Sequence, residues 1–369
     1  MRPMPAAPST VQSIGHSAMG EVEHQRGQAG LAIQIALGDL APHDAVASWD
    51  WRTVAPLAGR NAVLVRLAER FGSAQIPLPD FVAVAVARER QRVAHALRLI
   101  QVIDQNCACH GIAHLFPKAL QHYPDMGHDV DLLVITESTA VDRLVLGDVS
   151  AAGGRRELRD RLAGTTSYRI ADTALTLDIQ HGRLGILGEH RRLATLIVDN
   201  RRRTDVAGMA LDIPSPEHQI VLQAFQKVSG TSSLRLADVL FTIAAARGGQ
   251  LDWSHLIRVA RQAGVFHSLC CYLTYVDQIH REQFRRPLLA PEVHEALRIH
   301  GWGRAVFRDG LYRFPHRSVH RRLNTVYLAR ALISGDWGAA GRLCCLPLLA
   351  AGRRLRRLVR RPGGAEHQS

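Results

Sequence analysis

The sequence predicts an α+β protein in which a small mixed β-sheet lies between N-terminal helices and a helical C-terminal domain. Two stretches, one before residue 110 and one after Pro214, repeat apolar residues at the roughly 3.6-residue spacing of helices that pack on a core. Between them, residues 111 to about 190 carry short apolar runs separated by turn residues, a pattern typical of strands.

The first predicted helices follow an N-terminal arm. Residues 1–28 contain proline, serine and glycine with little apolar periodicity, so we expect them to be mobile. A longer helix is predicted over residues 81–105, after Pro79 and with Asp80 as its N-cap. Between the two, the pattern becomes helical from Leu31, and one apolar stripe consists of Val63, Leu64, Leu67 and Phe71.

The predicted sheet begins with the apolar run IAHLF, which Pro117 terminates. The runs VDLLVI, TSYRIA and ALTLDIQ have the composition of further strands, and we include RLGIL with them. Within this region, RRELRDRLAG is predicted to be a helix. The region is therefore mostly sheet, with little helix.

The C-terminal domain is predicted from a series of amphipathic segments. The first begins with Ser215, Pro216 and Glu217, which are residue types preferred at an N-cap and in a first helical turn. Two later segments end at Gly248 and Gly264, and glycine commonly follows a last helical turn. The chain is thus divided into an arm, a helical lead-in with the sheet core, a helical domain and an apolar, arginine-rich tail: 1–28, 29–205, 206–338 and 339–369.

Much of the basic charge is concentrated at one end of the chain. Lys+Arg total 46 against Asp+Glu 33 in 369 residues, which gives a formal net charge of +13. Such an excess favours a polyanionic partner, such as nucleotide phosphates, nucleic acid or an anionic membrane. Six arginines lie within residues 353–361, and without them the net charge falls to +7. Nucleic acid is therefore not the favoured partner.

The tail that carries these arginines, LCCLPLLAAGRRLRRLVRR, has two interpretations. Its apolar and arginine residues suit peripheral contact with an anionic membrane surface. Alternatively, it forms a helix that packs on the body of the protein and leaves its arginines in solvent.

Cysteine usage indicates a reducing compartment. Two pairs of the six cysteines are sequence neighbours, Cys270-Cys271 and Cys344-Cys345, and the others show no regular spacing, so no disulfide framework is expected. The N-terminus lacks the apolar core of a signal peptide, and no apolar run reaches the roughly 18 residues of a membrane-spanning helix. We therefore expect a cytoplasmic protein.

The principal candidate site is the motif His128-Asp129-Val130-Asp131 at the start of an apolar strand. Because side chains alternate along a strand, both carboxylates leave the same face. Like charges this close raise each other's pKa, so a cation between them stabilises the pair, and oxygen ligands suit Mg²⁺ or Mn²⁺. Asp178, in a later predicted strand, adds a third carboxylate if the two strands are neighbours. The alternative is that Asp129 and Asp131 are solvated loop acids.

These motifs lie within a wider family resemblance. The segments GIAHLFPKALQHYPDMGHDVDLLV and LTLDIQHGRLGILGEH resemble the minimal nucleotidyltransferases of the polymerase-beta-like superfamily, in particular a group of uncharacterised bacterial nucleotidyltransferases. The helical stretch from IPSPEHQIVLQAFQKV to DWSHLIRVARQAG is also similar to the C-terminal region of that group. The resemblance covers about residues 80–275.

The resemblance implies an enzyme that moves a nucleoside monophosphate from an NTP to a hydroxyl acceptor and releases pyrophosphate. Asp129 and Asp131 would bridge two Mg²⁺ ions, and Asp178 would share one of them and accept the acceptor's proton. Mg²⁺ or Mn²⁺ would be the cofactor and the NTP the co-substrate. The acceptor stays open: a small molecule, a peptide or protein side chain, or an RNA end.

The turn before the D-x-D motif departs from this family. Gly-Ser or Lys-Gly is usual there, whereas this chain has Phe116-Pro117-Lys118-Ala119. Proline has no N–H to offer to a phosphate, so Lys118 is the candidate replacement, acting as a point charge. His181 and Arg183 complete the expected phosphate ligands. Each of these three residues also has an interpretation as an ordinary surface or strand-edge residue.

Other polar groups near the motif carry alternative interpretations. Cys107, Cys109, His110 and His114 form a C-x-C-H-x₃-H pattern, but the crowded spacing favours a helix end over a zinc site. The remaining candidates are neighbours of the acids in sequence, a turn acid and an arginine run that suits a solvated face: His122, His128, Glu189 and Arg201-Arg202-Arg203.

A second class of function also fits the sequence. The altered Pro117-Lys118 turn is compatible with a non-catalytic binding or scaffold protein that keeps the nucleotidyltransferase fold. Such a protein would contact a membrane peripherally through its basic tail.

Overall fold

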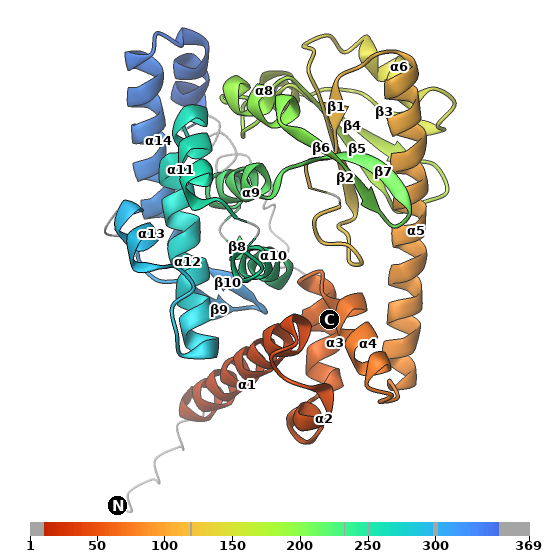
Figure 1. Cartoon of the computed structure of the whole chain (residues 1–369), viewed down its shortest axis with the longest axis vertical. Coiled ribbons are helices and arrows are strands. Elements are labelled where there is room, and N and C mark those ends of the chain that lie inside the picture. The colour runs from red at the N-terminus through yellow and green to blue at the C-terminus, as the bar shows by residue number, and fades with distance from the viewer. Residues whose placement is uncertain (1–10, 119, 232, 250, 298–301, 347–369) are drawn as a thin grey trace, which may run out of the picture.

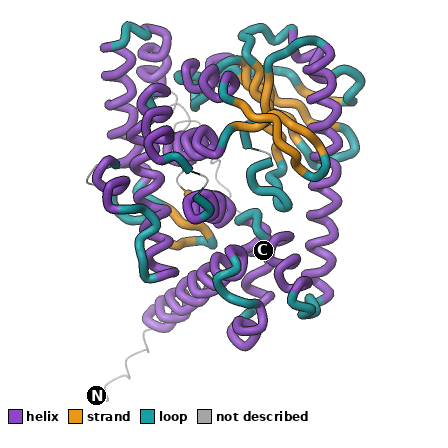
Figure 2. Tube along the Cα trace, in the orientation of Figure 1, coloured by secondary structure: helices purple, strands orange, loops and turns teal. Residues whose placement is uncertain are grey.

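The computed structural model describes residues 11–118, 120–231, 233–249, 251–297 and 302–346 of the chain, and it has the predicted α+β class. A mixed β-sheet lies in one part of the molecule and most of the helices lie in the other (Figure 2). The long helix α5 (Asp80–Cys109) extends along both parts (Figure 1).

Helix α5 joins two hydrophobic cores. It has 30 residues and is therefore about 45 Å long. Pro79 is at the N-cap position, and Asp80 is the first helical residue and not the predicted cap. Val82 and Val86 near its start are buried in the helical core, whereas Val93, Ile100 and Ile103 farther along are buried in the sheet core. One continuous helix thus holds the two cores together.

Helix α1 (Val11–Leu37) occupies most of the segment predicted to be a mobile arm, so that prediction is wrong for its helical part. Contacts distant in sequence hold this helix. Arg26 Nη2 lies 2.6 Å from Glu282 Oε2, and Gln28 Nε2 donates a 2.7 Å hydrogen bond to Ser48 O. The local sequence of the arm does not indicate a helix, because the residues that hold α1 in place lie elsewhere in the chain. The first ten residues of the arm lie outside the described part.

Three further α-helices and one 3-10 helix precede α5. They are α2 (Pro42–Ala45), the 3-10 helix Val46–Ser48, α3 (Trp51–Arg60) and α4 (Leu64–Ser73). The predicted apolar stripe lies at the start of α4 and along it, and all of its members are buried, which confirms that helix.

The predicted C-terminal helices are present. They are α9 (Pro216–Gly230), α10 (Leu236–Arg247), α11 (Trp253–Ala263) and α12 (Phe266–Phe284). Helices α13 (Pro291–Ala296), α14 (His316–Ile333) and a helix over residues 337–346 follow them. Ser215 caps α9 by accepting a hydrogen bond from the His218 N–H, and Gly248 and Gly264 follow α10 and α11 as predicted. A small sheet in the order β8-β10-β9 was not predicted; it consists of β8 (Ser233–Leu234), β9 (Val306–Arg308) and β10 (Leu311–Arg313).

Helices from both ends of the chain share one core. Helix α1 packs against α3, α4, α10 and α12. In addition, Asn61 Oδ1 accepts a 2.9 Å hydrogen bond from the Leu236 N–H at the start of α10. The N-terminal helices therefore pack with the C-terminal helical domain, although the sequence suggested that they lead into the sheet.

The main sheet has five strands in the order β1-β2-β5-β4-β3. The strands are β1 (His114–Leu115), β2 (Asp129–Val134), β3 (Ala151–Gly153), β4 (Thr165–Ile170) and β5 (Thr176–His181), and the helices near them are α6 (Val141–Leu146), α7 (Leu158–Ala163) and α8 (Arg191–Asp199). Strands β2 and β5 are parallel, and the other pairs are antiparallel. The run RLGIL is not a strand, because only an isolated bridge joins Leu184 to His190 there.

The two faces of the main sheet differ in polarity. Val130, Leu132, Leu177 and Ile179 are buried in the sheet core together with residues of α5. The residues that alternate with them, including the three candidate aspartates, lie on the opposite face. This alternation determines which side of the sheet can carry chemistry.

A hairpin of β6 (Arg201–Val206) and β7 (Met209–Pro214) connects the sheet to α9, and the predicted domain boundary at residue 205 falls within β6. The arginine run is part of this hairpin. Arg201 and Arg203 lie 3.2 and 3.5 Å from carboxylate oxygens of Asp212, and Arg203 also lies 3.1 Å from Asp104. The run is exposed but partly committed to these ion pairs.

The start of the predicted tail packs on the body of the protein. Ala339, Ala340 and Leu343 are buried in the helical core. Residues 347–369, which include the arginine-rich stretch, lie outside the described residues. Among the helices described, none has the length and apolar character needed to span a membrane. All six cysteines are free, as predicted.

His218, in the first turn of α9, makes the stability of the fold depend on pH. Burial, the neighbouring His255 and Arg202 lower the pKa of His218 from 6.5 to about 4. The native state therefore binds fewer protons than the unfolded state, and stability falls as the pH drops from about 6.5 toward 4. When the pH is lowered from 7 to 5, the free energy of unfolding of the wild type should fall by about 2 kcal/mol more than that of His218→Gln.

Urea unfolding of both proteins at the two pH values measures this difference. An equal loss in the wild type and in His218→Gln would contradict the assignment.

Candidate functional site

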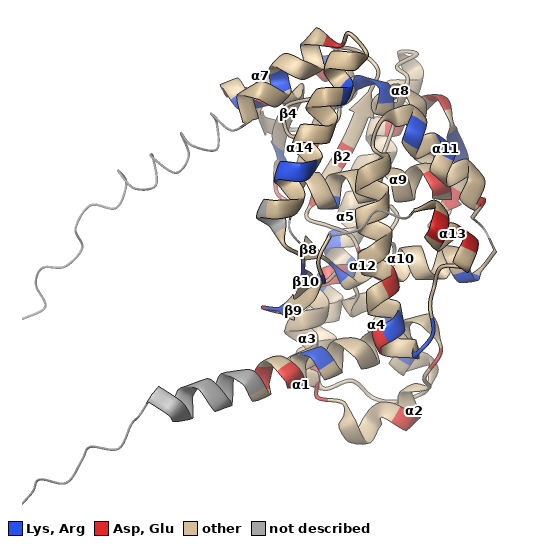
Figure 3. Ribbon diagram, turned by 90° about the vertical axis from the view of Figure 1, so that its left-hand side faces the viewer, with Lys and Arg blue, Asp and Glu red and all other residues tan. Residues whose placement is uncertain are grey.

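A cavity of about 460 Å³ opens between the polar face of the sheet and the helical domain. Asp129 and Asp131 of β2 line one wall, and α9 and the start of α10 line the other. Figure 3 shows acidic colour on strand β2. Basic residues from both walls face the same space: Lys118, Arg159, Arg183, Lys227 and Arg235.

The register of β2 and β5 brings the three candidate carboxylates onto one face. In this parallel pair, Asp131 is aligned with Asp178, and Asp129 is aligned with Thr176. Asp129 is exposed, Asp178 is half-buried and Asp131 is buried. The expected neighbouring strands are therefore present, and they place a D-x-D pair beside a third aspartate.

The three carboxylates influence one another. Burial raises the pKa of Asp178, and the negative charges of Asp131 and Asp129 raise it further, against the opposing effect of a hydrogen bond from Ser167. Asp178 does not itself line the cavity. Within the described residues, no group of three or more His, Cys, Asp and Glu side chains is arranged to hold a metal ion.

Donors from the chain itself occupy the two motif carboxylates. Lys118 Nζ and Gln180 Nε2 both lie 2.9 Å from Asp131 Oδ1, and the Thr176 hydroxyl donates to Asp129 Oδ1. Lys118, in the turn before the D-x-D motif, therefore neutralises Asp131. A metal ion bound by Asp131 would have to displace Lys118, which would then be free to pair with an anion.

The other two expected phosphate ligands differ in their placement. Arg183 lines the cavity, and its Nη2 lies 2.8 Å from Glu137 Oε1. His181, in contrast, is buried on the opposite face of the sheet, 3.3 Å from Asp142 Oδ1. It follows Asp178 by three residues, and an odd spacing along a strand directs two side chains to opposite faces. The structure thus does not place His181 with the phosphate ligands, contrary to the prediction.

The remaining polar candidates near the motif divide between the cavity and structural roles. His122 and His128 line the cavity. Glu189 is buried and accepts hydrogen bonds from the Ile186 and Leu187 N–H groups, so it closes a turn and does not join the acidic cluster.

Within the part of the chain that the structure describes, the cysteine and histidine pattern is not arranged as a group that could hold a metal ion. Burial raises the pKa of the Cys107 thiol to about 12, whereas Cys109 is exposed. His114 Nε2 lies 3.0 Å from Asp104 Oδ1. The pattern is therefore the end of α5 and the start of β1, as the spacing favoured.

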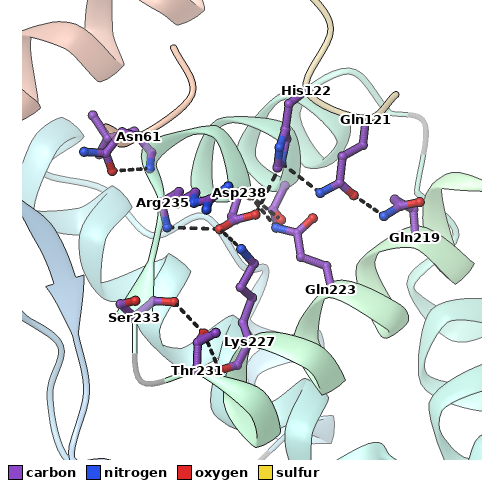
Figure 4. Close-up of polar contacts among 12 residues, drawn as sticks. Asn61, Gln121, His122, Gln219, Gln223, Lys227, Thr231, Ser233, Arg235 and Asp238 are labelled. Carbon is purple, nitrogen blue, oxygen red and sulfur yellow. Dashed lines mark hydrogen bonds and ion pairs between the residues drawn. The ribbon is translucent and has the colours of Figure 1, made fainter. Parts of the chain in front are cut away.

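A polar network on the helical wall of the cavity was not predicted (Figure 4). Asp238 of α10 is fully buried, and its Oδ2 lies 2.8 Å from Lys227 Nζ and accepts a 3.0 Å hydrogen bond from the Arg235 N–H. Its Oδ1 lies 3.2 Å from His122 Nε2. Burial by itself would raise the pKa of Asp238, but Lys227 and His122 outweigh burial and hold this pKa well below its usual range.

The pKa of His122 is lowered in this network. Burial lowers the pKa of its imidazole more than Asp238 raises it. The sequence contained one sign of the network, an aspartate inside the apolar run LRLADVLF, where a buried carboxylate needs a cationic partner.

Comparison of the chain with protein-family models, curated proteins and solved structures finds no match in any of the three. The interpretation of the cavity therefore depends on its residues and their geometry.

The Lys227–Asp238 pair is expected to stabilise the fold. Lys227→Met leaves the Asp238 carboxylate buried without its cation, and loss of one partner of a buried pair costs about 3 kcal/mol. The double variant Lys227→Met/Asp238→Asn removes both charges and should recover most of that loss. Urea unfolding of the three proteins at pH 7 measures the effect, and an unchanged stability of Lys227→Met would contradict it.

Proposed function

We propose that the protein is a metal-dependent nucleotidyltransferase that moves a nucleoside monophosphate from an NTP to a hydroxyl acceptor. The observation that carries the proposal is the parallel, in-register pair β2–β5, which aligns Asp131 with Asp178 on the face that opens into a basic cavity. Carboxylate oxygens are the ligands that Mg²⁺ and Mn²⁺ prefer. Asp129 and Asp131 would supply such oxygens once Lys118 leaves Asp131, and Asp178 would have to move toward them to complete the site.

When bound, Mg²⁺ would supply charge stabilisation for the phosphates and for the attacking oxygen. Asp129 and Asp131 would hold it, with Asp178 beside them. The oxygen of the acceptor hydroxyl forms a bond to the α-phosphorus of the NTP. The bond between the α-phosphorus and the oxygen that bridges the α- and β-phosphates breaks, and pyrophosphate leaves. Asp178 takes the proton of the acceptor hydroxyl. Lys118, Arg159 and Arg183 bind phosphate oxygens, with the guanidinium groups offering paired N–H donors.

The size of the cavity favours a small acceptor. Its volume of about 460 Å³ lies in the range of about 300–1,000 Å³ that is usual for small-molecule sites. A space of this size suits one nucleotide and a small hydroxyl compound or a single side chain better than a nucleic-acid duplex. Cytoplasmic ATP or another NTP would be the donor.

Asp129 provides the first test. We expect Asp129→Asn to lose Mg²⁺-dependent NTP turnover by roughly 100-fold or more, because several kcal/mol of charge stabilisation are removed. Pyrophosphate release with each of the four NTPs measures turnover, and Asp148→Asn is the matched control on the exposed loop after α6. Equal turnover in Asp129→Asn and the wild type would refute the assignment.

Lys118 provides the second test. Because Lys118 competes with a cation for Asp131, Lys118→Met should bind Mn²⁺ alone roughly tenfold more tightly, a difference of about 1.4 kcal/mol. The same variant should turn over NTP more slowly, since a phosphate ligand is lost. Titration calorimetry with Mn²⁺ and the pyrophosphate assay give the two readouts. Weaker Mn²⁺ binding in Lys118→Met would contradict the competition.

A non-catalytic binding or scaffold protein is the second candidate. It is favoured by the occupation of Asp129 and Asp131 by Thr176 and Lys118. Thermal unfolding with Mg²⁺ and ATP separates the two functions, because the catalytic proposal requires a ligand-dependent rise in the midpoint. A wild type that neither turns over NTP nor shifts with either ligand would favour the scaffold.

A further inference from the structure

The helical wall of the cavity contains one of only two lysines in the chain. The sequence has 44 arginines and two lysines, Lys118 and Lys227, and both line this cavity from opposite walls. Each lysine is held by an aspartate, Lys118 by Asp131 at 2.9 Å and Lys227 by Asp238 at 2.8 Å. Arginine serves as the cation almost everywhere else, so the compact, mobile ammonium group is confined to this space.

The helical wall keeps an uncompensated positive charge. Asp238 balances Lys227, and burial lowers the pKa of His122, which disfavours a second positive charge there. The exposed Arg235 guanidinium has no acidic partner among the described residues and lines the cavity beside Lys227. This wall therefore attracts an anion, whereas the opposite wall carries the aspartates that suit a metal ion.

The wall also holds an acceptor atom without a partner. Gln223 is buried, and its Nε2 donates to Asp238 O at 2.9 Å and to the Tyr272 hydroxyl at 2.5 Å. Its Oε1 is buried and has no hydrogen-bond partner among the described residues, although Gln223 lines the cavity. A ligand hydroxyl would satisfy this oxygen.

The backbone N–H groups at the start of α10 already donate hydrogen bonds within the chain and are not available to bind an anion. The Leu236 N–H donates to Asn61 Oδ1, and the Ala237 N–H donates to Asn61 O. The Arg235 N–H is taken by Asp238. The positive charge of this wall therefore comes from side chains and not from a free helix N-terminus.

We infer that Lys227 and Arg235 form a metal-independent phosphate-binding subsite on the helical wall, opposite the carboxylates. Asp238 positions Lys227, and Gln223 accepts a hydrogen bond from a hydroxyl of the same ligand. The phosphate belongs either to the tail of the NTP or to a phosphorylated acceptor, and both have the same chemistry at this subsite. The subsite does not depend on nucleotidyl transfer, because it requires no metal and no turnover.

The two lysines make a direct experiment feasible. Protein labelled with ¹³C at lysine Cε gives two lysine signals, which Lys118→Arg assigns. Titration with inorganic pyrophosphate in EDTA should shift the Lys227 signal in a saturable way. Arg235→Gln should weaken this binding roughly tenfold or more, since one of two charged ligands is lost.

Two controls separate this inference from the proposed function. Asp129→Asn should bind pyrophosphate in EDTA like the wild type, even if it has lost NTP turnover. Arg143→Gln removes one exposed charge from α6, outside the cavity, and should also leave binding unchanged. A Lys227 signal that does not move, unchanged binding in Arg235→Gln, or equal weakening in Arg143→Gln would overturn the subsite.

Competition between ATP and pyrophosphate shows whether the subsite takes the phosphates of the NTP or a phosphate of the acceptor. If ATP in EDTA displaces pyrophosphate from the wild type, the subsite takes the NTP tail. If both ligands bind together, so that the Lys227 signal keeps its pyrophosphate-bound position, the subsite takes a phosphate of the acceptor.

Discussion

The parallel pairing of β2 with β5 is the contact on which the candidate site depends. Its register aligns Asp131 with Asp178 and fixes which residues of both strands turn away from the sheet core. A shift by one residue would bury these carboxylates among the apolar residues under α5 and expose Val130 and Leu132. Burial of the apolar residues on one face of the sheet therefore keeps the carboxylates on the opposite face.

Carboxylates on both walls of the cavity impose a second constraint, because a buried negative charge needs a positive partner. The chain meets it with its only two lysines, one on each wall of the cavity. The Lys118 side chain, which pairs with Asp131, is partly exposed, whereas Lys227 pairs with the fully buried Asp238. In our proposals, the first pair exchanges with a metal ion, and the second holds a cation in place for an anionic ligand.

The position of the helical wall depends on parts of the chain far apart in sequence. Helix α5 contributes to the sheet core and to the helical core, so it joins the two parts of the molecule between which the cavity lies. Asn61, between α3 and α4, binds the start of α10 next to Asp238. The N-terminal helices are therefore part of the support of the cavity.

The sequence by itself determined the order of helix and sheet, the start of α9 at Ser215 and the strand that carries Asp129 and Asp131, because these follow from local periodicity and capping. The tertiary structure decided the features that depend on contacts between residues distant in sequence, which the local pattern does not contain. It turned the expected arm into a helix through contacts with distant residues, and it paired Asp238 with Lys227 across two helices. Local alternation already excluded His181 from the acidic face, whereas the cations that face the acids were set by packing alone.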